Sequence, residues 1–282
     1  MKAYINGKII QEENVCISPF DRGFQFSDGA YEVVRVYSGK FFKLDEHINR
    51  LARSLKELKI NVPNLNKIRN AIHQLINKNN PEDKQALVYI QVTRGIFSPR
   101  QHKFPDEHIQ PTVYISTSPY TPHKNEIENG VKVILESDIR WARCDIKSIG
   151  LLPNVLGRQI AIENNACETV WIRNGNIMEG THTNFCVIKN GELITPPLSN
   201  LILAGITRKV VIKISENLSL PVNEKPINKQ DVETFDECMI VGTTVEVTPV
   251  IQINDWEIGN GIPGPITKKI QDEFYKLVLP DE

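Results

Sequence analysis

The sequence DIKSIGLLP, residues 145–153, places one lysine, Lys147, in a mostly apolar stretch just before a predicted helix. Burial disfavours the charged form of an amine. A neutral lysine amine is a nucleophile that can form a Schiff base with a carbonyl compound. The competing interpretation is that Lys147 lies at a strand end and extends its amine into water, as most lysines do. The local sequence leaves both interpretations open.

Three further polar groups follow this lysine along the chain, and each has an ordinary explanation. Residues 176–184, NIMEGTHTN, put an acid in a polar turn between two predicted strands, which turn chemistry alone would explain. Residues 205–207, GIT, open a predicted helix, where free backbone N–H groups bind anions or where Thr207 merely caps the helix. Residues 242–244, GTT, bring two hydroxyls to a strand end. Taken singly, none of the three identifies a function.

The composition is that of a globular chain and argues against several functions. The chain has 282 residues, 40% of them hydrophobic, enough for one large domain or two medium ones. Lys and Arg number 33 and Asp and Glu 34, so we expect no nucleic-acid partner. No apolar run approaches the roughly 18 residues that span a bilayer, so we expect no membrane partner. Five cysteines without C-x-x-C spacing, and no secretory signal at Met1, predict a cytoplasmic location.

Motifs for metals and for two large enzyme classes are missing. None of the six histidines is paired with another at i, i+3 or i, i+4, and none joins cysteines in a cluster. We therefore predict no metal site. The G-x-x-x-x-G-K-[ST] and G-x-S-x-G motifs are absent, so a P-loop or a nucleophile elbow has no support.

Apolar spacing and turn residues predict the elements of the first half of the chain. Two hairpins form around the turn residues Asn6-Gly7 and Ser38-Gly39-Lys40. A helix begins at Asp45, which acts as its N-cap. The remaining predicted elements are a second helix with Ile68, Ile72, Leu75 and Ile76 on one face, and strands over residues 86–93 and 112–116.

Residues 118–125, SPYTPHKN, contain two prolines and almost no apolar residue, so we interpret them as an interdomain linker. They separate a small α+β domain, residues 1–117, from a larger domain, residues 126–282. The elements predicted for the larger domain are strands at 131–135 and 238–241, hairpins centred on 174–175 and 190–191, and helices at 154–164, 207–217 and 265–277.

The order of these features resembles the fold-type IV pyridoxal-phosphate (PLP) enzymes. This class comprises the branched-chain and D-amino-acid aminotransferases and the aminodeoxychorismate lyases. A lysine, an acid 32 residues later, a Gly-x-Thr helix start and a Gly-Thr-Thr strand end follow one another, and the resemblance covers nearly the whole chain. PLP needs an amine for its aldehyde, an anion for its pyridinium nitrogen and donors for its phosphate. The resemblance implies the two-domain α+β fold of that class, with PLP bound by the larger domain and substrate by the smaller.

The same resemblance assigns cofactor roles residue by residue. Lys147 would bind PLP covalently and move a proton at the substrate Cα. Glu179 would face the pyridine nitrogen and keep it protonated, and Leu203 would pack on one face of the ring. The phosphate would be held by Arg50, Ile206, Thr207, Thr243 and Thr244.

Within the class, the first domain resembles the D-amino-acid aminotransferases. Residues 21–35, DRGFQFSDGAYEVVR, are similar to their segment, and Arg100-Gln101-His102 carries their R-x-H signature. Arg100 and His102, with Tyr31, would grip the substrate carboxylate through charge-assisted hydrogen bonds. The resemblance implies a homodimer in which Arg100 and His102 of one subunit complete the active site of the other. A solvated loop is the alternative for these two residues.

The resemblance therefore implies ping-pong transamination between a D-amino acid (D-alanine, D-glutamate) and a 2-oxo acid (2-oxoglutarate, pyruvate). The alternatives are an L-branched-chain aminotransferase or an aminodeoxychorismate lyase of the same fold, or a non-catalytic PLP-binding protein. Two departures from close relatives bear on the substrate range: Gly150 stands in place of an Asn, and His182 in place of a small hydroxyl residue.

Overall fold

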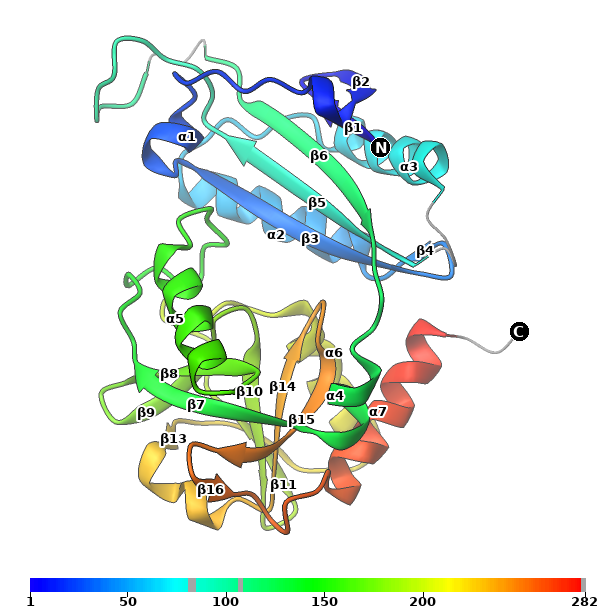
Figure 1. Ribbon diagram of the computed structural model, residues 1–282, viewed down its shortest axis with the longest axis vertical. Coiled ribbons are helices and arrows are strands. Elements are labelled where there is room, and N and C mark those ends of the chain that lie inside the picture. Colours follow the sequence, from blue (N-terminus) through cyan, green and yellow to red (C-terminus); the bar gives the residue numbers. More distant parts are fainter. Residues whose placement is uncertain (81–84, 106–108, 280–282) are drawn as a thin grey trace. The chain divides into compact units, whose positions relative to one another are not determined.

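The structure, a computed structural model, describes residues 1–80, 85–105 and 109–279 (Figure 1). The chain forms two compact units. The first consists of Met1–Thr121 together with Ile146–Gly150, and the second of the remaining residues. The change of unit after Thr121 falls inside residues 118–125. The segment that carries Lys147, however, groups with the first unit, whereas the sequence placed it within 126–282.

The first unit is built on a six-stranded antiparallel sheet with strand order β2-β1-β6-β5-β3-β4 (Figure 1). The strands are Lys2–Ile5 (β1), Lys8–Gln11 (β2), Gly29–Tyr37 (β3), Lys40–Phe41 (β4), Ala86–Thr93 (β5) and Thr112–Pro119 (β6). The helices are Arg22–Phe26 (α1), Leu44–Glu57 (α2) and Leu65–Asn79 (α3).

Tight turns set the register of both hairpins in this sheet. Asn6 and Gly7 have φ of 46° and 95°, and Ser38 and Gly39 have φ of 46° and 82°. Two consecutive residues with positive φ match the twist of a two-residue hairpin. Both predicted hairpins are confirmed, and Lys40 belongs to β4 rather than to the turn.

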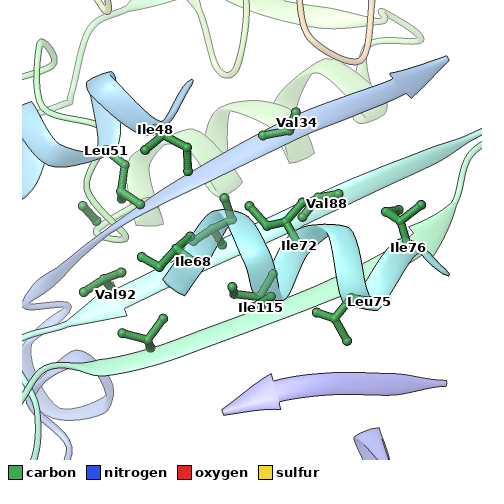
Figure 2. Close-up of a cluster of buried hydrophobic side chains, with 14 of the residues drawn as sticks. Val34, Ile48, Leu51, Ile68, Ile72, Leu75, Ile76, Val88, Val92 and Ile115 are labelled. Atoms are coloured by element: carbon green, nitrogen blue, oxygen red, sulfur yellow. The ribbon is translucent and has the colours of Figure 1, made fainter. Parts of the chain in front are cut away.

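The core of the first unit lies between the sheet and the helices α2 and α3. The side chains of Ile48 and Leu51 from α2, and of Ile72 from α3, pack against Val34 of β3 and Val88 of β5 (Figure 2). All five are fully buried. The apolar stripes at helical spacing thus cover one face of the sheet, as the sequence pattern predicts.

The start of α2 corrects one prediction. The helix begins at Leu44, and its N-cap is Lys43, so Asp45 is not the cap. Asp45 lies in the first turn, and its carboxylate accepts a hydrogen bond from Arg69 Nε (3.0 Å). An acid in the first turn also interacts favourably with the helix dipole, which explains why the residue marked the helix start without capping it.

The second unit is built on a mixed sheet that closes on itself. Its strand order is β12-β11-β10-β14-β15-β7-β8-β9-β13, and an additional pairing of β9 with β10 closes the path. The pair that closes it is Glu179 opposite Asn184. The strands are Val131–Ser137 (β7), Glu168–Arg173 (β8), Asn176–Gly180 (β9), Asn184–Lys189 (β10), Glu192–Thr195 (β11), Val222–Glu224 (β12), Ile227–Asn228 (β13), Glu237–Gly242 (β14), Glu246–Ile253 (β15) and Trp256–Glu257 (β16).

The α-helices described in the second unit are Lys124–Asn129 (α4), Leu152–Glu163 (α5), Ile206–Asn217 (α6) and Pro265–Val278 (α7), and residues Lys229–Thr234 form a 3₁₀ helix. The α+β fold and the helices predicted at 154–164, 207–217 and 265–277 are confirmed, with small shifts of their ends. The sequence analysis predicted no strand over β15. This strand contains Pro249, and although proline argues against a central strand, β15 lies between β14 and β7. Within the described ranges, none of the helices combines the length and apolar character needed to cross a membrane.

Candidate active site

The segment Ile146–Gly150 pairs with the start of β3. The Tyr31 N–H donates to the Lys147 carbonyl (3.0 Å), and the Ile149 N–H donates to the Gly29 carbonyl (3.1 Å). A Cβ at position 29 would lie 2.7 Å from the Val92 carbonyl of β5 and 2.9 Å from the Ile149 side chain, so glycine permits the close approach on both sides. The backbone of Lys147 is therefore fixed directly beside Tyr31.

The side chains of Lys147 and Tyr31 also meet. Lys147 Nζ donates to Tyr31 Oη at 3.3 Å and lies 4.3 Å from the centroid of the tyrosine ring. The lysine is half-buried, and its backbone N–H donates to Ser54 Oγ on α2 (3.2 Å). The structure thus brings the predicted catalytic lysine together with one predicted substrate-binding residue.

A buried carboxylate on β3, Glu32, binds Arg50 and His47 of α2. Arg50 Nε donates to Oε1 at 2.6 Å and Nη2 to Oε2 at 2.9 Å, while His47 Nδ1 lies 2.7 Å from Oε2. Burial acts to raise the pKa of Glu32, but Arg50 and His47 outweigh it and lower that pKa to about 2. Burial lowers the pKa of His47. The cluster therefore holds an anionic Glu32 at pH 7.

Sequence reasoning selected Arg50 but missed Glu32 and His47. A signal for Glu32 was present, because Ala30 and Val34 lie on the same face of β3 and are fully buried. A carboxylate at a core-facing position of a strand requires a buried cation or hydrogen-bond donors. A cation one helix away along the chain was therefore to be expected, although the sequence did not say which one.

Arg100 and His102 lie on the exposed loop after β5 and share a contact with Phe26. Arg100 Cζ lies 4.3 Å from the Phe26 ring centroid, and the His102 and Phe26 centroids are 5.3 Å apart. In the part of the chain that the structure describes, no hydrogen bond joins either residue to Tyr31. The contacts described for Arg100 and His102 are thus with Phe26, and those of Tyr31 are with Lys147.

Glu179, in the second unit, is held where the sheet closes. It is 5% exposed and lies opposite Asn184. Its Oε2 accepts from Asn184 Nδ2 (3.0 Å) and from the Leu203 backbone N–H (2.9 Å), and its Oε1 accepts from Arg140 Nη1 (2.5 Å). The predicted residues Glu179 and Leu203 are thus in direct contact. The Glu179 carboxylate accepts hydrogen bonds from a guanidinium, a side-chain amide and a backbone N–H.

Arg140 is a further site residue, which sequence reasoning missed. Its Nε donates to Asp138 Oδ1 (2.9 Å) and its Nη2 to Asp138 Oδ2 (3.0 Å). Burial acts to lower the pKa of Arg140, but Asp138 and Glu179 raise it overall. A guanidinium that stays charged beside Glu179 favours the ionised carboxylate. The only sequence signal was the Asp-x-Arg spacing after β7.

The N-cap residue of helix α6 is Gly205, which has no side chain to hydrogen-bond the first N–H groups of the helix. A Cβ at position 205 would lie 1.9 Å from Asn184 Oδ1, so glycine is required there. The first N–H groups of a helix have no partner within it and favour an anion. Ile206 and Thr207 lie in this first turn and are nearly buried, so Thr207 is not the cap.

Thr243 and Thr244 directly follow β14, next to the start of β10. Val241, near the end of β14, pairs with Asn184. A Cβ at Gly242 would lie 3.4 Å from the His182 carbonyl. The second unit thus gathers its predicted cofactor residues at one end of β10: Glu179, Leu203, Ile206, Thr207, Thr243 and Thr244.

A second buried carboxylate, Glu168, fixes the turn after β9. Thr181 Oγ1 donates to its Oε1 (2.6 Å), Thr183 Oγ1 donates to its Oε2 (3.2 Å), and His182 Nδ1 lies 2.9 Å from Oε2. Burial acts to raise the pKa of Glu168, but His182 and Thr181 lower it overall. His182, one of the two departures, is therefore a partner of this carboxylate and is partly exposed.

The first unit contributes the amine of Lys147, and the second unit contributes the buried Glu179 carboxylate and a helix start capped by glycine. Comparison with known proteins identifies the family. The family model of the amino-transferase class IV matches residues 29–253. The chain belongs to this family.

Relatives with high coverage point to one activity. The D-alanine aminotransferase of Bacillus licheniformis is 39% identical over 100% of this chain and 98% of its own length. That of Listeria monocytogenes serotype 4b is 38% identical, covering 99% and 96%, and that of Staphylococcus haemolyticus is 37% identical, covering 98% and 98%.

Solved structures of similar fold include branched-chain aminotransferases. The Escherichia coli branched-chain amino acid aminotransferase has a TM-score of 0.91 at 25% identity, with 98% of this chain and 94% of that chain covered. The enzyme of Thermoproteus uzoniensis, solved with norvaline, has a TM-score of 0.88 at 27% identity, with 100% and 96% covered.

Proposed function

We propose that this chain transfers an amino group between a D-amino acid and a 2-oxo acid. The donors would be D-alanine and D-glutamate, and the acceptors 2-oxoglutarate and pyruvate. The observation that carries the proposal is the identity of 37–39% to D-alanine aminotransferases over 98–100% of the chain. The two half-reactions would follow a ping-pong course.

The cofactor we propose is PLP, because the donor set of the chain fits it. Lys147 would supply the amine. Glu179 would supply the anion, and its carboxylate accepts hydrogen bonds from Asn184 and from the Leu203 N–H. The start of α6, which is capped by Gly205, would bind the phosphate. Bound PLP would accept the amino group and withdraw electrons from the substrate Cα. The residues that would hold it are Lys147, Glu179, Leu203, Arg50, Ile206, Thr207, Thr243 and Thr244.

The roles of the chain's own residues follow from their contacts. Lys147 would move the proton at the substrate Cα as a general acid and base, and Tyr31 Oη, 3.3 Å away, would orient its amine. Glu179 would hold the proton on the cofactor's ring nitrogen, and Arg140 would keep Glu179 ionised for that task.

The substrate site we propose is completed by a second copy of the chain. Arg100 and His102 of one copy would bind the substrate carboxylate beside Tyr31 of the other, which agrees with the exposure of both residues. Helix α5 supports a homodimer, because it exposes large apolar side chains at positions i, i+3, i+4 and i+10, and such surfaces suit protein interfaces. These are Leu152 (70% exposed), Val155 (61%), Leu156 (48%) and Ile162 (55%).

The second candidate is an L-branched-chain aminotransferase, favoured by the TM-scores of 0.91 and 0.88. The deciding experiment is a chiral panel of donors, D-alanine, D-glutamate, L-leucine and L-isoleucine, with 2-oxoglutarate as acceptor. We expect turnover with the D-donors and little with the L-donors. Turnover restricted to L-leucine and L-isoleucine would replace our proposal by the second candidate, and no turnover by a PLP-loaded chain would favour a non-catalytic protein.

We further propose a cytoplasmic location. All five cysteines are free, and a reducing compartment keeps thiols in that state. Burial raises the pKa of Cys144 and of Cys186 to about 11, so these thiols are poor nucleophiles and have no part in the proposed chemistry.

A further inference from the structure

A buried arginine, Arg22 of α1, hydrogen-bonds to the loop that carries Arg100 and His102. Arg22 is 4% exposed. Its Nη1 donates to the Gln101 carbonyl at 2.7 Å and lies 3.4 Å from the Lys103 carbonyl. Gln101 is the residue between Arg100 and His102. Arg22 therefore binds the backbone at the centre of the predicted carboxylate-binding segment.

The direction of the Arg22 side chain is itself fixed. Asp28 accepts from Arg22 Nε (2.8 Å) and also from Arg94 Nε (2.7 Å) and Nη2 (2.9 Å). Arg94 in turn donates to the Leu58 carbonyl (2.7 Å) at the end of α2. The loop is thus connected through two arginines and one carboxylate to a helix that is part of the core.

Phe26, at the end of α1, adds a second fixed point for the same loop. The guanidinium carbons of Arg22 and Arg100 lie 4.7 and 4.3 Å from its ring centroid, and the His102 ring lies 5.3 Å away. Cations are attracted to an aromatic face at such distances. Both predicted carboxylate-binding side chains therefore rest on one ring, whose position is shared with Arg22.

We propose that Arg22 is a positioning residue for substrate recognition, which rests on the proposed function of Arg100 and His102. By holding the Gln101 carbonyl, Arg22 sets the direction in which the two flanking side chains meet the substrate carboxylate. Lysine cannot replace it, because an ammonium lacks the planar fork that bonds Asp28 and Gln101 at the same time. Arg22 does not touch the substrate.

The test substitutes Arg22→Lys in the PLP-loaded enzyme. The matched control is Arg69→Lys on α3, a partly buried arginine whose partner, Asp45, is exposed. We expect KM for D-alanine to rise roughly tenfold, the size of one lost charge-assisted bond, with kcat within about twofold, as for binding lost equally in ground and transition states. The Kd of propionate, measured by calorimetry as a carboxylate probe, should rise by the same factor. Arg69→Lys should change neither. Unchanged KM and Kd in Arg22→Lys would overturn the proposal.

Two further variants separate this inference from the proposed function. In Arg100→Ala, adding Arg22→Lys should raise KM by a smaller factor than Arg22→Lys does in the wild type, because part of the Arg22 effect is exerted through Arg100. If Arg100→Ala alone leaves KM unchanged, the carboxylate site of the proposed function is wrong. If Arg100→Ala raises KM but the two effects multiply in the double variant, Arg22 does not act through Arg100. If Arg22→Lys fails to fold, Phe26→Leu replaces it as the test, and it should show the same rise in KM with kcat retained. An unchanged KM in Phe26→Leu would then overturn the proposal.

Discussion

Arg50 of α2 and Glu32 of β3 form a buried ion pair, with Nε and Oε1 2.6 Å apart and the side chains 10% and 0% exposed. The same carboxylate binds His47 of α2. Ser54, one turn beyond Arg50, accepts from the backbone N–H of Lys147. One side of α2 therefore carries the arginine and contacts the lysine that we assign to the cofactor.

The first prediction concerns this ion pair. Glu32→Gln leaves the Arg50 charge buried without its counter-ion, so we expect the free energy of unfolding to fall by about 3–5 kcal/mol. Urea denaturation of the cofactor-free protein measures it. The control is Glu46→Gln on α2, the helix that carries Arg50. The partner of Glu46 is Lys43, whose side chain is 42% exposed. That surface pair should contribute no more than about 1 kcal/mol. Equal losses in the two variants would contradict the buried pair.

The second prediction is the pH dependence of that contribution. The pKa of Glu32 is lowered from 4.5 to about 2 in the folded protein. A carboxyl with a lowered folded pKa stabilises the fold above its unfolded pKa and loses that contribution as the pH falls towards the folded pKa. The stability difference between wild type and Glu32→Gln should therefore shrink by about 3 kcal/mol between pH 4.5 and pH 2. A constant difference across this range would show that Glu32 is not the titrating group.

The features that could be predicted from the sequence are those that a local pattern of residues determines. Hairpin turns such as Asn6-Gly7, the apolar stripes of α2 and α3, and the residue types around Lys147 and Glu179 are all visible in short windows. Pairs distant along the chain are not: Glu32 and Arg50 are 18 residues apart and Arg140 and Glu179 are 39 apart. Their partners follow from strand register and helix facing, which only the fold determines.

The grouping of Lys147 illustrates the same limit. Its sequence position is inside the second half of the chain, but its backbone pairs with β3 of the first unit. The segment Ile146–Gly150 pairs with the first unit through hydrogen bonds of its backbone that join Lys147 to Tyr31 and Ser54, and Ile149 to Gly29. No periodicity in residues 145–153 reports a pairing of this kind.

The third prediction is that Lys147→Ala abolishes repeated turnover of D-alanine. Loss of a general acid–base group costs about 10²–10⁴-fold in rate, and the covalent link to the cofactor is lost with it. The backbone bonds of residue 147 remain, so the fold should be retained, as circular dichroism can confirm. Lys56→Ala, at an exposed lysine of α2, should behave like wild type. More than a tenth of the wild-type rate in Lys147→Ala, without added amine, would refute the assignment.

The fourth prediction is that Glu179→Gln keeps the cofactor bound but slows removal of the Cα proton of D-alanine. A neutral amide cannot hold the proton at the ring nitrogen. The amide also directs an NH₂ group at Arg140 or at the donors Asn184 and the Leu203 N–H, which costs about 1–3 kcal/mol of stability. Single-turnover rates and thermal unfolding measure the two effects. Rates equal to wild type would mean that another residue faces the nitrogen.

The last prediction concerns the carboxylate site. Arg100→Ala should lower kcat/KM for D-alanine roughly ten- to a hundredfold, because a charge-assisted hydrogen bond contributes about 1.5–3 kcal/mol and about 1.36 kcal/mol is tenfold in rate. The absorbance of bound cofactor should not change, since Arg100 contacts Phe26 and is not among the residues that we assign to the cofactor. Discrimination between D- and L-alanine should also relax, because a loosely held carboxylate lets the Cα present either face to Lys147.

Mixing two impaired variants tests whether Arg100 acts on its own chain or on the partner. A hybrid dimer of Arg100→Ala and Lys147→Ala chains would hold one site with both substitutions and one site with neither, if each site takes Lys147 from one chain and Arg100 from the other. Activity should then reappear on mixing, up to about half the wild-type rate per hybrid dimer, as one of its two sites is intact. If the site is built within one chain, each hybrid site carries one substitution and activity stays at the mean of the parents. Subunit exchange is verified by tagging one variant and isolating hybrids before the assay, so that absence of recovery in isolated hybrids excludes the shared site.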